Sequence, residues 1–223
     1  MAANILSSSN SSAAQNTTTG ASRHWLKWLP PVLYLSAAVL MIVSTAFPYW
    51  GLILQAPQYP GGLQMRVFVN YITGDDDPKL DEVREIDGLN HYIGMKSLYD
   101  AAQLERSIAI PGMVVMIILL IVAAFWRRRW TWLLTIPALL FPFIYLADLA
   151  FWMNHYGQNL DPYAPLSSAI RPFTPPILGE GVIGQFKTVA NVDVGWYLIV
   201  LGSALIVLAA VLRFAQRRAR TSG

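Results

Sequence analysis

The chain has 223 residues, of which 55% are hydrophobic and only 13% are charged. Soluble domains are usually about 25% charged, so this composition favours a protein embedded in lipid. The absence of cysteine excludes disulfides, thiolate metal sites and iron–sulfur clusters. Although the net charge is +3, the basic residues are not interleaved with aromatic residues as in a nucleic-acid groove, so we expect no nucleic-acid partner.

The N-terminal part of the chain predicts a tail and a first membrane helix. Residues 1–22 are mainly Ser, Asn, Thr and Ala without apolar periodicity, and they predict a disordered cytoplasmic tail. An apolar window over residues 29–54 follows, long enough to cross a hydrocarbon core of about 30 Å. Pro30 and Pro31 are expected at its entry, where a missing amide costs little.

Residues 55–107 predict a small folded segment outside the membrane. Apolar residues alternate over residues 63–72, which is typical of a strand. Asp77 and Pro78 form a helix-start signal, so a short helix is expected from there to about Gly88. Together these signals predict a mixed α/β cap.

The rest of the chain predicts three more membrane helices. Residues 108–126 and 130–153 are apolar and leave only residues 127–129 between them, which predicts a tight antiparallel hairpin with a cytoplasmic turn. Residues 154–194 are rich in Pro and Gly and have no long helical pattern, so we expect an irregular second cap segment that lies over the first. Residues 195–214 predict the fourth helix and residues 215–223 a basic cytoplasmic tail. The predicted fold is an all-α membrane protein with four transmembrane helices and a small mixed α/β extracytoplasmic cap.

The distribution of charge predicts which side faces the cytoplasm. Nine of the sixteen basic residues, and no acidic residue, lie before the first window, between the second and third, or at and beyond the end of the fourth. Basic residues gather on the cytoplasmic side of membrane proteins. We therefore expect both ends in the cytoplasm and a location in the bacterial cytoplasmic (inner) membrane. The nine residues are Arg23, Lys27, Arg127, Arg128, Arg129, Arg213, Arg217, Arg218 and Arg220.

Two pairs of Met and His on the predicted outer face suggest a metal site. His91 and Met95 form an H-x-x-x-M pattern, and Met153 and His155 form M-x-H. Imidazole and thioether together suit copper, especially Cu(I), and Met65 is a further candidate ligand. The alternative is that the methionines fill gaps in packing and the histidines make structural hydrogen bonds.

Asp148 is the one ionisable residue well inside a predicted membrane helix. Such residues are costly and commonly functional. On a helix Asp148 shares a face with His155, so its carboxylate is a candidate second-shell partner that orients the imidazole. The alternative is an interfacial carboxylate that pairs with Arg171 or caps backbone amides.

Three stretches of the outer segments together resemble a known group of proteins. They are residues 56–63 (APQYPGGL), residues 89–95 (LNHYIGM), and residues 155–162 (HYGQNLDP) followed by 175–179 (PPILG). They resemble small bacterial four-helix membrane proteins associated with nitrous oxide reductase and copper-maturation gene clusters. The resemblance implies that His91, Met95, Met153 and His155 hold copper for delivery to a periplasmic partner, or that the chain docks an accessory protein or an ABC transporter.

These observations lead to three functional hypotheses. The first is an accessory protein that assists maturation or copper supply of a periplasmic copper enzyme such as nitrous oxide reductase. The second is a non-catalytic membrane scaffold or subunit of a larger complex, and the third is a permease component of a transporter. We do not expect an enzyme, because no nucleophile is paired with a base in a recognisable motif.

Overall fold

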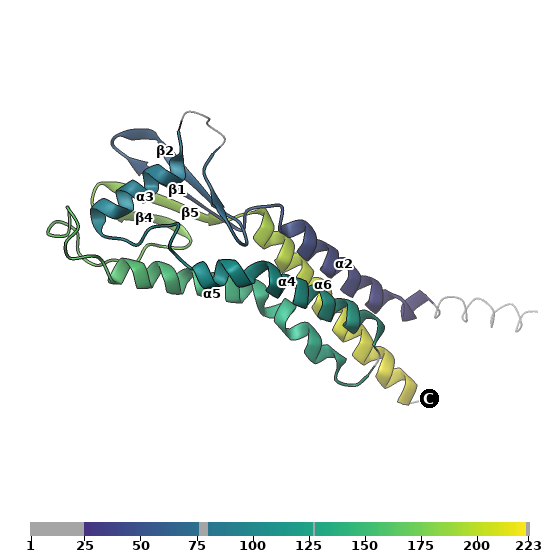
Figure 1. Ribbon diagram of the computed structural model, residues 1–223. Helices are drawn as coiled ribbons and strands as arrows, with labels where there is room; N and C mark the ends of the chain where they lie inside the picture. Colours follow the sequence, from purple (N-terminus) through teal and green to yellow (C-terminus); the bar gives the residue numbers. More distant parts are fainter. Residues whose placement is uncertain (1–24, 76–79, 127, 222–223) are drawn as a thin grey trace, which may run out of the picture.

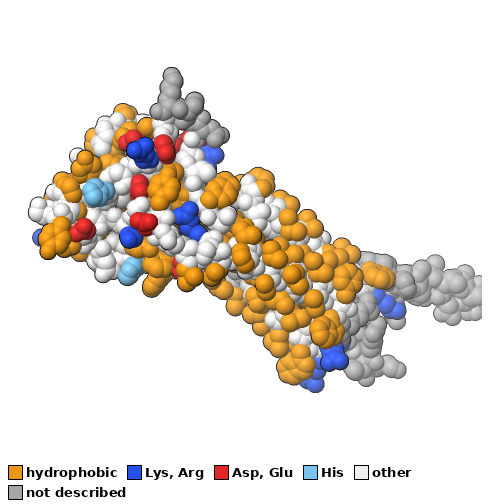
Figure 2. All heavy atoms as spheres, in the orientation of Figure 1, with side chains coloured by type: hydrophobic (Ala, Val, Ile, Leu, Met, Phe, Trp, Pro, Cys, Tyr) orange, Lys and Arg blue, Asp and Glu red, His pale blue; other side chains and the backbone are white. Residues whose placement is uncertain are grey.

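The protein consists of a bundle of apolar helices with a smaller cap at one end (Figure 1). The computed structural model describes residues 25–75, 80–126 and 128–221, so the predicted tail over residues 1–22 lies outside the described residues. Figure 2 shows hydrophobic side chains covering the visible face of the bundle, while acidic side chains on this face gather on the cap.

Four helices form the bundle. A short 3₁₀ turn, η1, leads into the first of them, and Pro30 and Pro31 lie in its first turn as predicted. A second 3₁₀ turn, η2, precedes the third. The elements are η1 (Trp25–Lys27), α2 (Leu29–Ser44), α4 (Gln103–Phe125), η2 (Thr131–Thr135), α5 (Ile136–Gln158) and α6 (Val194–Thr221).

Three helical segments of the described chain are long and apolar enough to cross a membrane, where four were predicted. They are Gln103–Phe125, Thr131–Gln158 and Val194–Ala219. The first apolar helix has only 16 residues, about 24 Å at 1.5 Å per residue. The window over residues 29–54 looked longer because residues 50–54 are also apolar. They form part of a strand whose alternate side chains are buried, and hydropathy alone does not separate these two cases.

The other predicted helix boundaries also shift. α4 begins at Gln103, before the predicted position 108, and α5 continues past position 153 to Gln158. Most of the predicted tail over residues 215–223 is helical, because α6 reaches Thr221. Only residues 126–130 separate α4 from η2, which agrees with the predicted tight hairpin.

The cap contains an antiparallel sheet of five strands in the order β3-β2-β1-β5-β4. The described chain is mostly helical, and the sheet together with a helix makes the cap mixed α/β, as predicted. The predicted strand over residues 63–72 is replaced by two strands that flank a turn, β2 and β3. The strands are β1 (Trp50–Ala56), β2 (Tyr59–Val67), β3 (Ile72–Thr73), β4 (Gly179–Ile183) and β5 (Phe186–Val192).

The second cap segment contributes a hairpin, which the sequence did not predict. β4 and β5 pair around a turn at Gly184, whose φ is 61°, and β5 pairs with β1 so that Trp50 lies opposite Val192. Between α5 and β4 the segment is irregular and lies against the first segment, as predicted. There the Asp161 N–H donates to the Gly94 carbonyl at 2.9 Å.

Helix α3 (Glu82–Ile93) is the helix of the cap. The Asp81 side chain accepts from the Arg84 N–H and caps its start, so the helix begins later than the predicted Asp77, which lies outside the described residues. It ends at Gly94, whose φ of 83° suits a residue without a side chain.

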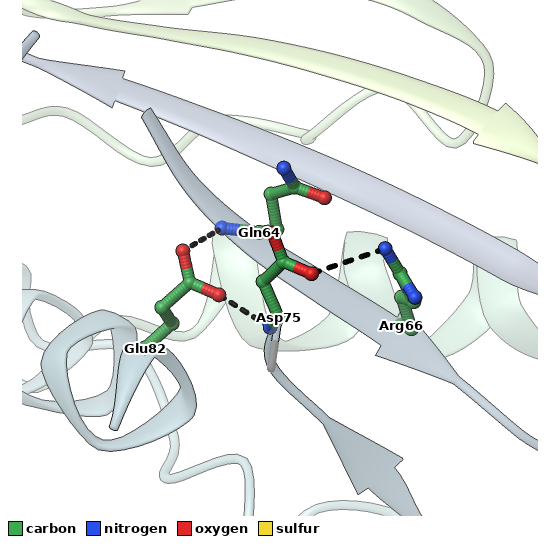
Figure 3. Close-up of polar contacts among 4 residues, drawn as sticks. All are labelled: Gln64, Arg66, Asp75 and Glu82. Atoms are coloured by element: carbon green, nitrogen blue, oxygen red, sulfur yellow. Dashed lines mark hydrogen bonds and ion pairs between the residues drawn. The ribbon is translucent and has the colours of Figure 1, made fainter. Parts of the chain in front are cut away.

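A buried carboxylate joins α3 to the sheet (Figure 3). Glu82 is only 6% exposed, and its two oxygens accept from the backbone N–H groups of Gln64 in β2 and of Asp75 after β3. Asp75 also forms an ion pair with Arg66 at 3.3 Å. One side chain therefore holds α3, β2 and the chain after β3 together.

Candidate ligand-binding cavity

A cavity of about 440 Å³ lies between the cap and the parts of α4 and α5 nearest to it. Its cap wall comes from β1, β2, β5 and α3, and its other wall from the two bundle helices. In Figure 1, α5 extends beyond the bundle and lies beneath the sheet. Part of this apolar helix therefore forms a wall of the cavity under the cap.

The spacing of apolar residues in β1 and α3 explains how the cap forms its wall of the cavity. In β1, Trp50, Leu52 and Leu54 alternate with more exposed residues, and all three line the cavity. In α3, Ile86 and Ile93 are buried two turns apart and also line it. Because strands have a period of two and helices one of 3.6, both elements present an apolar face to the same space.

The cavity reaches the outer surface of the bundle. Ile108 of α4 and Ile144 of α5 both line it, and each is 55% exposed. Gly112 of α4 also lines it, and a Cβ built on this glycine would meet nothing within 4 Å. The rim therefore includes exposed apolar residues of both helices, and the cavity opens toward the side of the bundle.

A small polar group lies on the α5 wall. Tyr145, Asp148 and Trp152 are spaced three and four residues apart, so they share one face of the helix, and all three line the cavity. The Tyr145 hydroxyl and the Trp152 indole N–H are buried and have no hydrogen-bond partner among the described residues. The Trp152 N–H lies near the Asp148 carboxylate, one turn away.

Charged residues from α4 complete the polar end. Glu105 lines the cavity and is near enough to Asp148 for the two carboxylates to interact electrostatically. The neighbouring Arg106 donates to the backbone carbonyls of Asn70, Leu98 and Tyr99 at 3.3–3.4 Å. Arg106 therefore fastens two connections of the cap to the start of α4.

The two methionines of the predicted copper site line the same cavity. Met95 follows α3, Met153 lies in α5, and both line the cavity. Met65 of β2, which the sequence suggested as an extra ligand, lines it too, as does Met116 of α4. The walls of one cavity thus carry four thioether groups.

The two histidines are placed elsewhere. His91 and His155 are exposed, and neither is among the residues that line the cavity. The His155 ring stacks on Phe151 and lies with its Nδ1 3.4 Å from Nδ2 of Asn159. His91 contacts Tyr92 edge to face. The described residues contain no group of three or more His, Cys, Asp or Glu side chains that are arranged to hold a metal ion.

Asp148 does not have the partners considered from the sequence. Within the described residues no hydrogen bond joins it to His155, and no ion pair joins it to Arg171. Its neighbours are Glu105 and Trp152. Glu105, Tyr145 and Trp152 were not predicted as site residues, because in the sequence each resembles an ordinary boundary or lipid-facing residue. Only the helical spacing of Tyr145 and Trp152 from Asp148 was a usable signal.

No protein-family model matches the chain, and no curated protein is significantly similar to it.

Proposed function

We propose that this protein is an integral accessory protein of the bacterial inner membrane that binds an amphiphilic molecule in the cavity beneath a periplasmic cap. The observation that carries the proposal is the cavity itself. Its volume of about 440 Å³ falls in the range of small-molecule sites, about 300–1,000 Å³, which are mostly apolar with a few polar groups.

The position of the cavity favours a ligand that arrives from the bilayer. The exposed rim residues Ile108 and Ile144 belong to helices that are apolar enough to cross a membrane. An apolar chain lying between these residues would remain in contact with lipid, while a polar end near Asp148 would lie under the cap. A water-soluble polar substrate would gain little from such a lining.

The arrangement of charge supports the proposed orientation. Lys27, Arg128 and Arg217 lie at the end of the bundle away from the cap, as parts or neighbours of η1, η2 and the end of α6. The Gln216 side chain donates to the Leu26 carbonyl at 2.6 Å, so the two described ends of the chain lie together. By the positive-inside rule this end is cytoplasmic, with α2 as a shorter membrane helix. Tags on the two termini should be inaccessible to protease in intact spheroplasts, and an accessible tag would contradict this topology.

Photolabelling tests the cavity. The protein would be placed in lipid nanodiscs with a dodecyl amphiphile that carries a diazirine, and the labelled peptides would be mapped after illumination. We expect label on the α3 peptide that contains Ile86 and Leu89, which a lipid-soluble probe reaches through the cavity. Label confined to exposed faces of the bundle would contradict the proposal.

A pair of substitutions in α4 provides the matched control. Gly112→Trp places an indole in the cavity without a backbone collision, and it should abolish labelling of α3. Val115→Trp adds the same group at an exposed position that does not line the cavity, and it should leave the labelling unchanged.

Copper supply to a periplasmic enzyme, such as nitrous oxide reductase, is a second candidate function. The observation that favours it is the presence of Met65, Met95, Met116 and Met153 on the walls of one cavity, because thioethers are soft ligands that suit Cu(I). Copper would then be cargo held by sulfur, without the two exposed histidines. A Cu(I) titration against a competing chelator tests this candidate separately from the photolabelling.

A further inference from the structure

The polar end of the cavity contains acceptors and donors of hydrogen bonds side by side. Asp148 and Glu105 carry carboxylate oxygens, which only accept when ionised. The buried Tyr145 hydroxyl and Trp152 N–H are donors without a hydrogen-bond partner among the described residues. Buried polar groups are normally paired, and an unpaired one is destabilising. A ligand that matches this end must therefore both donate and accept.

The charges that line the cavity balance. Lys96 and Arg106 are its basic residues, and Glu105 and Asp148 are its acidic ones. Because the formal charges cancel, the lining gives no net preference for a charged ligand, and an ion would also lose its hydration in this apolar space. An uncharged polar group is the better match.

We propose that the ligand of this cavity is an amphiphile with an uncharged hydroxyl head, which donates its one proton to the Asp148 carboxylate and accepts from Tyr145 and Trp152. A hydroxyl group has one donor and two acceptor sites, whereas an ether only accepts and an ammonium only donates. The hydrocarbon part of the ligand lies along the apolar walls toward Ile108 and Ile144. This inference rests on the proposed function and specifies its ligand.

Competition among amphiphiles with the same chain tests the head group. Dodecanol, dodecylphenol, dodecyl methyl ether and dodecylammonium would compete with the photoprobe in nanodiscs, at concentrations expressed as mole fractions in the bilayer. We expect an alcohol or a phenol to compete best, about ten-fold better than the ether, which is the effect of one hydrogen bond to a charged group. The ranking of dodecanol against dodecylphenol distinguishes an aliphatic from an aromatic hydroxyl.

Two conservative variants connect the preference to the site. Asp148→Asn keeps the side-chain volume but replaces one acceptor oxygen by a donor group. Tyr145→Phe removes only the hydroxyl. Asp148→Asn should bind the ether as the wild type does and should lose most of the preference for the hydroxyl compound. Tyr145→Phe removes a donor from which the ether and the hydroxyl compound both accept, so it should weaken both and leave the preference unchanged.

The possible outcomes test the hydroxyl assignment and the proposed function separately. Equal competition by the ether and the alcohol, or strongest competition by dodecylammonium, would overturn the hydroxyl assignment and leave the cavity as a site for another amphiphile. An unchanged preference in Asp148→Asn would also overturn the assignment. If no compound competes and α3 is never labelled, the proposed function itself fails.

Discussion

Glu82 in the first turn of α3 accepts a hydrogen bond from the backbone N–H of Gln64 in β2, at 3.1 Å, from a position that is only 6% exposed. Its second oxygen accepts from the Asp75 N–H. The cap therefore depends on a carboxylate that satisfies two backbone donors from different segments, in a protein region with no disulfide to hold it.

Glu82→Gln should loosen the cap, because the new amide group turns a donor toward a backbone donor. We expect a loss of about 1–3 kcal/mol in stability, with faster hydrogen exchange at Gln64 and in the neighbouring strands. Hydrogen–deuterium exchange with mass spectrometry measures this. Arg84→Gln, in the same helix but with an exposed side chain, is the control and should leave exchange unchanged. Equal protection in the two variants would show that the Glu82 contacts contribute little.

Tyr145→Phe and Tyr49→Phe should change stability in opposite directions. The Tyr145 hydroxyl is buried and has no hydrogen-bond partner in the described part of the chain, so removing it relieves an unsatisfied group. The Tyr49 hydroxyl lies 2.6 Å from the Ser44 hydroxyl, so its removal loses a hydrogen bond worth about 1 kcal/mol. Thermal unfolding in nanodiscs, without added amphiphile, should show a higher midpoint for Tyr145→Phe and a lower one for Tyr49→Phe. A lower midpoint for both would mean that the Tyr145 hydroxyl is satisfied.

The copper candidate predicts that thioethers and not imidazoles determine affinity. Met95→Leu combined with Met153→Leu preserves the apolar volume and removes two soft ligands from the cavity, so Cu(I) affinity should fall by at least about ten-fold. His91→Ala and His155→Ala change exposed residues outside the cavity and should leave affinity unchanged. If the histidine variants lost Cu(I) affinity and the methionine variant kept it, the exposed histidines and not the thioethers would be the copper ligands.

Tyr59 should titrate at unusually high pH. Its hydroxyl donates to the Glu85 carboxylate at 2.5 Å, and this hydrogen bond raises the pKa of Tyr59 above its usual value of 10.0. Because the folded-state pKa is the higher one, the stabilising contribution is complete below the ordinary tyrosine pKa and disappears as the pH rises through the folded-state pKa.

The difference between the tyrosinate absorbance of wild type and of Tyr59→Phe measures this titration. We expect the wild-type difference curve to move to lower pH in Glu85→Gln, which replaces the carboxylate acceptor with an uncharged amide. A difference curve that stays in place would show that Glu85 does not control this tyrosine.

The positions of Met95 and Met153 show how far sequence reasoning reached toward the site. Both were selected from the sequence because they lie close to histidines, and in the structure both line the cavity. The neighbouring histidines do not follow them. Met153 and His155 are two residues apart on α5 and therefore point in different directions, and Met95 lies beyond the left-handed Gly94 that ends α3, so the helical spacing from His91 does not extend to it. Adjacency in sequence therefore does not establish adjacency in space.

Tyr145 and Trp152 show the opposite situation. In the sequence they are aromatic residues of an apolar window, and such residues commonly face lipid. Their role depends on which face of α5 is covered by the cap, and that is decided by the loops and strands that pack above it. The helical spacing from Asp148 places both residues on its face, but no local pattern shows that the cap covers this face.

Hydropathy and charge are local properties that can be evaluated in a window of residues. They were therefore enough to predict the apolar bundle, the separation of the basic end from the acidic segments, and the tight turn between α4 and α5. That Trp50–Ala56 is a strand became clear only from the fold, since its partner Phe186–Val192 lies far along the chain. The same pairing closes the cap over α5 and creates the cavity. Its walls come from segments that are far apart in the sequence, so no single segment could reveal it.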